Sequence, residues 1–261
     1  MVQVVAVSNQ KGGVGKTTTA INLSASLAAA GYRILLIDLD PQRNASVGLS
    51  SPIAQENVYT FLSGINDFSS SVHDTFVPNL RLMPSTINLS AIELELTSQK
   101  DREYVLKSRM HDMLDDYDFV FIDCPPSFGL LSLNAWNASS FVLIPLQCEY
   151  YALEGLVLLL NNILKIKKTF NKKLLISGVV LTMYEKRNVL SREIEIDVRK
   201  NLGEKVYKTV IPRNVKIAES PSHGKPVLFY DFKSPGTIAY LELAREFLKK
   251  HQIMEDNNEH I

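Results

Sequence analysis

Short apolar runs rich in Val, Ile and Leu alternate along the chain with segments whose apolar residues recur at helical spacing. Apolar runs of this length, bounded by turn residues, are typical of strands buried in a parallel sheet. The expected strands are 2–8, 33–40, 118–124, 141–147, 173–181 and 205–211. The expected helices are 17–30, 90–115, 153–169, 189–201 and 236–250.

This alternation predicts an α/β fold in which crossover helices connect the strands of a mostly parallel sheet. We expect a single doubly wound domain over 1–261, with an ordered core of about 2–250 and a polar tail at 251–261. The stretch from about 43 to 80 is less periodic, so its elements stay open. The apolar and basic pattern of 237–251 is better explained by a core-packed final helix than by a membrane anchor.

Composition excludes several classes of protein. The 261 residues include 28 Lys and Arg and 28 Asp and Glu, so the overall charge indicates no class of partner. Cys124 and Cys148 are too few for a disulfide framework and suit a reducing compartment. No apolar run approaches the roughly 20 residues of a membrane span, and the first residues lack the pattern of a signal peptide. We therefore expect a soluble, cytoplasmic protein.

The segment SNQKGGVGKTTT, residues 8–19, lies between the first expected strand and the first expected helix. A loop there directs backbone N–H groups and the positive end of a helix dipole at one point, which suits phosphate. Lys16 would bring charge to the β and γ phosphates, and the Thr17 hydroxyl would bind Mg²⁺. The expected ATP contacts in this loop are Gly12, Gly13, Val14, Gly15, Lys16, Thr17 and Thr18.

The loop has Gln10 where the general Walker A pattern has Gly, and a second lysine, Lys11, opens it. In this form, KGGVGKT, it resembles the deviant Walker A loop of the ParA, MinD, nitrogenase iron protein and arsenite-pump ATPases. In that group the early lysine reaches the phosphates bound by the partner subunit. The resemblance therefore implies a homodimer that forms on ATP binding, in which Lys11 acts across the interface and assists catalysis beside Lys16.

Three aspartates follow apolar strands, at the edge where open α/β sheets place residues that contact ligands. Asp38 and Asp40 end the tract LLIDLDP, and Asp123 follows VFI before CPP. Asp123 matches the Walker B aspartate, which holds Mg²⁺ through water. By resemblance, Asp40 positions the attacking water and Asp38 belongs to the magnesium surroundings. The five histidines show no ligand spacing, so we expect no metal other than Mg²⁺.

Further tracts resemble ParA/Soj-type partitioning ATPases, and the likeness runs from about residue 2 to about 250. These tracts are 40–46 and 123–135, which are the first and second expected switch segments, and 147–156 and 211–231. Arg43 departs from the pattern, because many relatives have Gly at this position, and it leaves the shape of the first switch loop open. The resemblance also implies that Pro212 lies against the adenine ring of ATP and that Asn214 reaches the edge of the ring.

The C-terminal part of the chain carries a mild basic bias. Residues 185–250 contain 14 Lys or Arg against 9 Asp or Glu. A few phosphate contacts per subunit would give weak, salt-sensitive binding to double-stranded DNA without sequence preference. Arg187 matches a DNA-binding arginine of Soj-type proteins and Lys216 lies near a second such position; Arg213 and Lys200 are further candidates. Scattered, solvated lysines would explain the same bias.

The resemblance implies an ATPase whose ATP-bound sandwich dimer binds DNA non-specifically on the nucleoid, and whose hydrolysis releases it. A ParB-like centromere-binding protein would stimulate hydrolysis. The main alternative is a MinD-like, membrane-associated regulator of cell division; we expect no stable membrane association, because the end of the chain is acidic and polar. An iron–sulfur electron-transfer ATPase and a metabolic P-loop ligase are further alternatives, which cysteine placement and response to DNA would distinguish.

Overall fold

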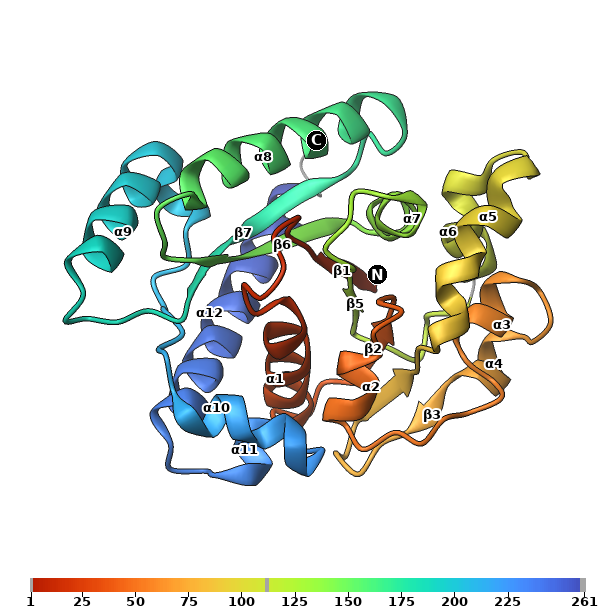
Figure 1. The fold of residues 1–261 in the computed structure, drawn as a ribbon, viewed down its shortest axis with the longest axis horizontal. Coiled ribbons are helices and arrows are strands. Elements are labelled where there is room, and N and C mark those ends of the chain that lie inside the picture. Colours follow the sequence, from red (N-terminus) through yellow and green to blue (C-terminus); the bar gives the residue numbers. More distant parts are fainter. Residues whose placement is uncertain (1, 111–112, 259–261) are drawn as a thin grey trace.

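The computed structural model describes residues 2–110 and 113–258 (Figure 1). Seven strands form one sheet in the order β3-β4-β2-β5-β1-β6-β7, and β3 pairs antiparallel while the other pairs are parallel. This confirms the expected α/β fold. The strands are β1 Gln3–Val7, β2 Ile34–Asp38, β3 His73–Asp74, β4 Leu80–Met83, β5 Phe119–Asp123, β6 Phe141–Gln147 and β7 Leu175–Thr182.

Helices connect the strands and cover both faces of the sheet. The α-helices are α1 Lys16–Ala29, α2 Asn44–Gly48, α3 Val58–Leu62, α4 Phe68–Ser71, α5 Ile92–Glu95, α6 Val105–Met110, α7 Leu130–Ala138, α8 Ala152–Thr169, α9 Val189–Leu202, α10 Val215–Glu219, α11 Val227–Tyr230 and α12 Pro235–Asn258. Short 3-10 helices add Ile87–Ala91, Leu96–Ser98, Arg102–Tyr104, Gly203–Lys205 and Ser220–His223.

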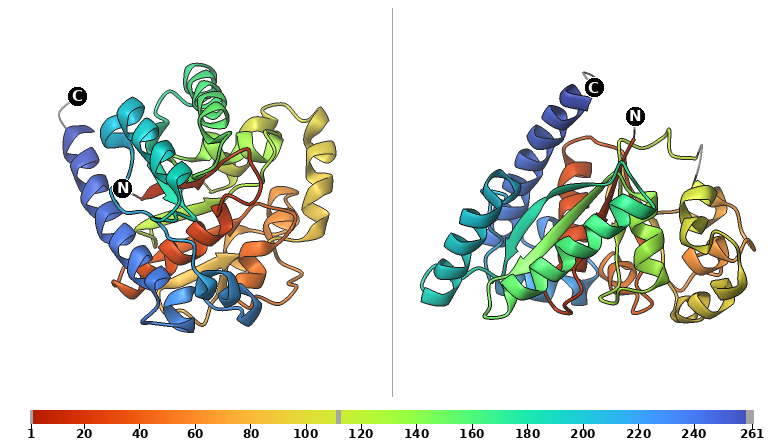
Figure 2. Two further views of the ribbon diagram at one scale, coloured as in Figure 1. Left: turned by 60° about the vertical axis from the view of Figure 1, so that its left-hand side comes forward. Right: turned by 90° about the horizontal axis from the view of Figure 1, so that it is seen from above.

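The sheet separates two apolar cores, because successive residues of a strand point to opposite faces. In β1, Val4 and Ala6 join the core that includes α7 and α8, whereas Val5 and Val7 join the core that includes α1 and α12. Figure 2 shows α1 and α12 on one side of the sheet and α8 on the other. The sheet is therefore buried on both faces, which explains why its strands read as continuous apolar runs.

The single helix expected over 90–115 is wrong. The chain forms α5 and α6 separated by 3-10 turns, with an extended Gln99 and a left-handed Asp101 between them. Asn134 of α7 accepts a hydrogen bond from the backbone N–H of Leu106 and donates one to the carbonyl of Arg102. Tertiary hydrogen bonds thus replace helical ones here. Residues 111 and 112 of the expected helix lie outside the described residues.

The strand expected over 205–211 is also wrong. The stretch forms an isolated bridge between Val206 and Val179, and its backbone meets β7 near its two ends, where the N–H of Tyr207 bonds Val179 and the N–H of Ile211 bonds Leu181. Between them, the N–H groups of Lys208 and Thr209 instead bond the Glu246 carboxylate of α12 at 2.6 and 2.9 Å. A side chain thereby takes the place of a sheet partner. Within 43–80, the stretch left open, the structure adds β3, β4 and three short helices.

The last helix, α12, packs against α1 through its buried residues Tyr240, Leu243 and Phe247. This confirms that the apolar pattern of 237–251 belongs to the core. The helix extends beyond the expected boundary at 250, to Asn258. None of the helices in the described part of the chain combines the length and apolar character that a membrane span requires.

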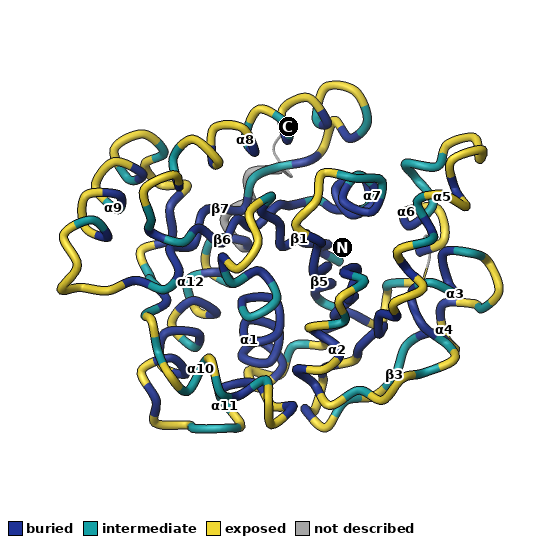
Figure 3. The backbone as a smooth tube through the Cα atoms, in the orientation of Figure 1, coloured by how far each residue is buried: buried dark blue, intermediate teal, exposed yellow. Residues whose placement is uncertain are grey.

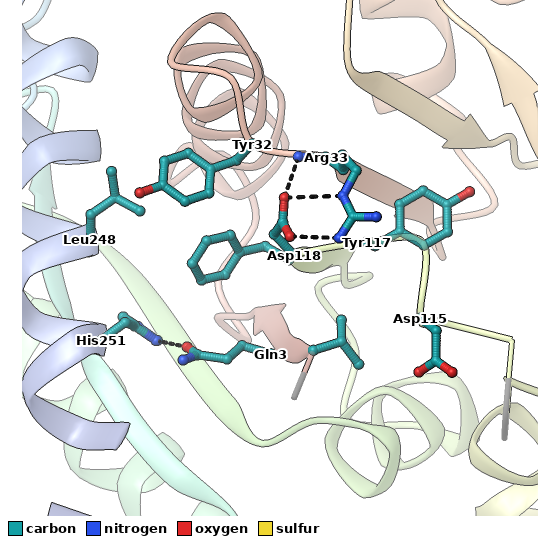
Figure 4. A pocket seen from close by; sticks show the side chains of 10 residues that line it. Gln3, Tyr32, Arg33, Asp115, Tyr117, Asp118, Leu248 and His251 are labelled. Atoms are coloured by element: carbon teal, nitrogen blue, oxygen red, sulfur yellow. Dashed lines mark hydrogen bonds and ion pairs between the residues drawn. The ribbon is translucent and has the colours of Figure 1, made fainter. Parts of the chain in front are cut away.

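His251 anchors α12 to the sheet (Figure 4). Its Nδ1 bonds the Gln3 side-chain oxygen, its Nε2 lies 2.8 Å from the Ser177 hydroxyl, and the ring stacks on Phe247. Burial, with a smaller effect of Lys250, lowers the pKa of His251 to about 3. The imidazole is therefore neutral in the folded protein, with the Nδ1 proton donated to Gln3.

Because the folded-state pKa of His251 lies below its unfolded value, its contribution to stability is complete above about pH 6.5 and is lost as the pH falls. We expect His251→Phe to remove part of the acid sensitivity, about 1.4 kcal/mol per pH unit between pH 6.5 and 5. Urea unfolding at several pH values measures this slope. His223→Gln provides the control, because it replaces an exposed histidine that does not anchor α12. If the unfolding free energy of His251→Phe depended on pH as steeply as that of the wild-type protein, His251 would not contribute to the acid sensitivity.

Candidate active site

The carboxyl ends of three adjacent strands bring the expected catalytic segments together. Asp123 of β5 is the register partner of both Asp38 in β2 and Val7 in β1. The glycine-rich loop follows β1, and the two expected switch segments follow β2 and β5. The chain crosses from β1 toward β2 and β4, and from β5 toward β6 and β7. Open α/β sheets bind ligands where the direction of connection reverses in this way.

The glycine-rich loop has the backbone shape that its sequence predicts. Gly13 and Gly15 have φ values of 76° and 86°, a left-handed conformation that glycine adopts without strain, and Gly15 is the N-cap residue just before α1. The Thr182 hydroxyl at the end of β7 donates to the Val14 carbonyl at 2.8 Å. Asn9 joins the loop to β6, because its amide donates to the Pro145 carbonyl at 2.8 Å.

Asn9 and Thr182 are supports of the loop that the sequence analysis missed. Asn9 also accepts the backbone N–H of Lys11 at 3.1 Å, so it fixes the start of the loop at two points. For Thr182 a signal existed: it is a polar residue that ends an apolar strand, as Asp38 and Asp123 are.

Lys16 points back over the loop and is almost fully buried. Its Nζ donates to the Lys11 carbonyl at 3.0 Å. Burial lowers the pKa of Lys16, and the nearby Asp123, Cys124 and Asp40 oppose this shift. A buried ammonium group at the start of α1 is placed to meet anionic oxygens that approach the backbone N–H groups of the loop.

Asp38 holds the first switch segment. Its Oδ2 accepts the Ser46 hydroxyl at 2.6 Å and the Ser46 backbone N–H at 2.7 Å, and its Oδ1 accepts the Asp40 backbone N–H. Full burial raises the pKa of Asp38 to about 6, and these hydrogen bonds counteract part of the rise. Since both oxygens are engaged within the chain, contact with a metal through water remains a prediction for Asp38.

Asp123 differs from Asp38 in its hydrogen bonds. It is fully buried, and no donor among the described residues satisfies its carboxylate oxygens at ordinary hydrogen-bond geometry, although the Thr17 hydroxyl lies near enough to lower its pKa. Burial, followed by repulsion from Asp38, raises its pKa well above the usual range, while the nearby Thr17 hydroxyl and Lys16 act against the rise. A buried carboxylate without a partner is unfavourable unless a cation or donor joins it.

This arrangement fits Mg²⁺. Among the side chains that the structure describes, within 2–110 and 113–251, no three His, Cys, Asp or Glu form a cage that could hold a metal alone. Mg²⁺ does not need one, because it binds through one or two carboxylates, water and phosphate oxygens. Asp123 and the adjacent Thr17 hydroxyl would supply the chain's part of such a shell.

Lys11 does not reach into the loop that it opens. Its ammonium group forms an ion pair with Glu149, two residues beyond the end of β6, and both side chains are partly exposed. In this chain the two lysines of the loop are therefore separated: Lys16 turns inward and Lys11 turns toward the surface. The action of Lys11 on a partner subunit stays a prediction.

Arg43 resolves the question left open for the first switch loop. It adopts the left-handed conformation, with φ 59° and ψ 23°, and directly precedes α2. Glycine favours this region, which gives a physical reason for glycine at this position in relatives. The Arg43 side chain compensates by donating from Nε to the Ser85 carbonyl at 2.9 Å.

The expected adenine contacts lie beyond β7. The Asn214 side-chain oxygen caps α10 by accepting the N–H groups of Lys216 and Ile217, which leaves its amide N–H groups for an adenine edge. Pro212 lines a cavity of about 690 Å³ together with Arg187 and Arg213.

The expected DNA contacts are only partly brought together. Arg187 is exposed and shares that cavity with Arg213, whose guanidinium pairs with Glu185 at 2.7 Å. Lys216 lies on α10 and pairs with Glu219 at 3.0 Å, and Lys200 lies in the last turn of α9. The neighbouring acids reduce the positive charge at two of the four positions.

Comparisons with known proteins agree with this geometry. The profile of a family described as an AAA domain matches residues 2–176. The chain is 49% identical to the sporulation initiation inhibitor protein Soj of Bacillus subtilis, over 94% of this chain and 98% of that protein. It is 47% identical to the chromosome partitioning protein ParA of Caulobacter vibrioides, over 96% and 95% of the two chains.

The chain belongs to the ParA/Soj family of P-loop ATPases. Among solved structures, this ParA/Soj chain resembles cobyrinic acid a,c-diamide synthase of Mycobacterium smegmatis with bound ADP and magnesium, at 35% identity and a TM-score of 0.85 over 97% and 96% of the two chains. It also resembles the cell division ATPase MinD of Pyrococcus furiosus, at 26% identity and a TM-score of 0.79 over 95% and 99%.

The unpaired Asp123 gives a test of the site in the nucleotide-free protein. A carboxyl group whose pKa is raised in the folded state destabilises the folded protein as the pH rises above the pKa of the unfolded chain, which is near 4. We expect Asp123→Asn to raise the free energy of unfolding by roughly 1–2 kcal/mol at pH 8, with a smaller gain at pH 5. Denaturant unfolding without Mg²⁺ measures it.

Asp118→Asn is the matched control. Asp118 pairs with Arg33 at 2.9 Å, and this contact lowers the pKa of Asp118 (Figure 4). The control should therefore lower stability, or leave it unchanged, at pH 8. Equal stability of Asp123→Asn and the wild-type protein at pH 8 would show that the buried Asp123 carboxylate does not destabilise the nucleotide-free protein.

Proposed function

We propose that this chain is an ATP-dependent DNA-partitioning ATPase whose ATP-bound sandwich dimer binds DNA non-specifically and whose hydrolysis resets it. The observation that carries the proposal is the convergence of a phosphate-binding loop, a buried lysine and an unpaired aspartate at one sheet edge. Two relatives named as chromosome partitioning proteins match it over 95% and 88% of their length.

In this proposal the chain acts on ATP by positioning and charge neutralisation, without a covalent intermediate. The loop N–H groups and Lys16 hold the phosphates, and Asp123 with Thr17 holds Mg²⁺, which neutralises charge on the phosphates. Asp40, which is buried beside Asp38, orients the attacking water. Structural neighbours carry ADP or an ATP analogue together with magnesium, which supports both cofactors.

Dimerisation would place Lys11 on the phosphates of the partner subunit. The ion pair with Glu149 must then open, which is inexpensive because both groups are partly exposed and such surface pairs contribute only about 0–1 kcal/mol. A dimer doubles the number of weak DNA contacts, so DNA affinity would depend on ATP. Arg187, Arg213, Lys200 and Lys216 are the proposed contacts.

A ParB-like centromere-binding protein is the proposed partner that stimulates hydrolysis, and the DNA-bound form would reside on the nucleoid. Two other functions have support in the comparisons. A MinD-like membrane regulator is disfavoured because the apolar side of α12 is buried against α1. A synthase of the kind named among the structural neighbours is 35% identical, less than the partitioning relatives, and would not respond to DNA.

Asp40 tests the hydrolysis step. We expect Asp40→Ala to bind ATP and dimerise but to lose at least about tenfold in turnover, because removal of a water-positioning group raises the barrier without weakening ATP binding. Single-turnover hydrolysis and sedimentation with ATP measure the two properties separately. Lys16→Ala is the comparison variant, since it should lose ATP binding itself. Normal turnover in Asp40→Ala would remove Asp40 from this role.

Arg187 tests the DNA contact. We expect Arg187→Glu to keep ATP-dependent dimerisation and to weaken binding to random-sequence duplex DNA at low salt by about tenfold or more. Binding is measured with ATP, with ADP, and with ATP plus anionic liposomes as competitor. Lys100→Glu, an exposed lysine outside the basic region, is the matched charge control. DNA affinity that is equal in both variants would move the contact elsewhere, and capture by liposomes would favour the membrane regulator.

A further inference from the structure

One buried serine joins the first switch segment to two strands of the sheet. The segment alternates between exposed and buried residues around α2 (Figure 3). Ser46 lies within α2 and is fully buried, although this helix has only five residues. Polar side chains that are buried to this extent are held by specific hydrogen bonds, so the partners of the Ser46 hydroxyl indicate what the residue does.

The Ser46 hydroxyl connects the end of β4 with the end of β2. It accepts the backbone N–H of Ser85, which lies two residues beyond β4, at 2.9 Å. It donates to Oδ2 of Asp38, the last residue of β2, at 2.6 Å. A backbone N–H can only donate, so the hydroxyl must accept there and its single proton is left for the carboxylate. The direction of both hydrogen bonds is therefore fixed.

The Asp38 carboxylate that Ser46 holds also holds Asp40. Its Oδ2 accepts the hydroxyl and the backbone N–H of Ser46, and its Oδ1 accepts the backbone N–H of Asp40 at 3.3 Å. The Asp40 side chain accepts the N–H of Gln42 at 2.9 Å, which restrains how that carboxylate is turned. A continuous series of hydrogen bonds thus runs from Ser85 through Ser46 and Asp38 to the backbone of Asp40.

We propose that Ser46 is a positioning residue for ATP hydrolysis, which acts through Asp38 on the backbone of Asp40. The proposal rests on the proposed function, because that function assigns Asp40 to the attacking water. In this role Ser46 contacts neither ATP nor the water; its hydroxyl fixes the Asp38 carboxylate relative to the end of β4. A water-orienting group whose backbone is held in advance needs little rearrangement during the reaction.

The pattern of hydrogen bonds favours a role in hydrolysis over a role in ATP binding. Asn9 and Thr182 hold the glycine-rich loop, and Lys16 bonds the backbone of the same loop. These hydrogen bonds include neither Ser46 nor any other residue of α2. Loss of the Ser46 hydroxyl should therefore disturb the segment after β2 and leave the phosphate-binding loop in place.

The alternative is that Ser46 only stabilises the fold. Its removal would leave the buried N–H of Ser85 without an acceptor, which is unfavourable in any buried place, so a loss of stability does not separate the two roles. Ser71 provides the matched control. It is equally buried, and its hydroxyl donates to the Asp67 carbonyl at 2.8 Å, but it lies in α4, outside both switch segments.

The test compares Ser46→Ala, Ser46→Thr and Ser71→Ala in single-turnover hydrolysis and in ATP binding. We expect Ser46→Ala to lose about tenfold in turnover while its ATP affinity changes less than about twofold, because only the positioning of Asp40 is impaired. Ser46→Thr keeps the hydroxyl and should retain most of the turnover. Ser71→Ala should hydrolyse and bind ATP as the wild-type protein does.

Amide hydrogen exchange in the nucleotide-free protein gives a second readout that does not depend on ATP. In Ser46→Ala the N–H groups of Ser85 and Asp40 lose the restraint at the two ends of the series, so both should exchange at least about tenfold faster. In Ser71→Ala the same two groups should exchange at the wild-type rate. Residue-resolved NMR measures both.

The outcomes separate this proposal from the proposed function. Wild-type turnover in Ser46→Ala, beside an inactive Asp40→Ala, would overturn the role of Ser46 alone. A loss of ATP affinity as large as the loss of turnover would also overturn it, and so would an equal loss of turnover in Ser71→Ala or unchanged exchange at Asp40 in Ser46→Ala. A wild-type protein that does not hydrolyse ATP would overturn the proposed function and this role with it.

Discussion

Four charged side chains share a small, nearly dry volume at the carboxyl edge of the sheet, and the rest of the site is arranged around them. Lys16, Asp38, Asp40 and Asp123 are each at most 7% exposed, and three of the four carry the same sign. Such a group is unfavourable unless hydrogen bonds and counter-charges are placed with care. Lys16 therefore bonds the glycine-rich loop and Asp38 bonds the first switch segment, while Asp123 is left with capacity for a cation.

The same charges explain why the loop needs supports from distant strands. Asn9 and Thr182 tie the loop to Pro145 and to the end of β7, so its N–H groups are held before phosphate arrives. Preorganised donors stabilise developing charge because they need little rearrangement during the reaction. Five parallel strands thus contribute directly to one site: β1, β2 and β5 by carrying its segments, and β6 and β7 by holding the loop.

The sequence predicts which segments meet at the carboxyl edge of the sheet, because the signals for them are local. The loop glycines, Lys16 and the aspartates that end apolar strands are each read within a few residues. The sequence does not predict the break in 90–115, because the Asn134 contacts that replace helical bonds come from α7. The loss of a strand at 205–211 likewise depends on Glu246, about forty residues away. The sequence predicts α8 as a helix, but only its packing in the structure shows which of its residues are buried.

At Arg43 two opposing free energies of similar size act on the backbone of the first switch loop. A left-handed residue other than glycine is disfavoured by about 1–2 kcal/mol, and one hydrogen bond to the Ser85 carbonyl returns about 1 kcal/mol. These two quantities are similar in size, and each kilocalorie changes a ratio of conformers about fivefold. If the Ser85 carbonyl moves, Arg43 loses the bond that offsets its left-handed conformation, while the bonds of Asp38 to Ser46 still hold the next turn of the loop.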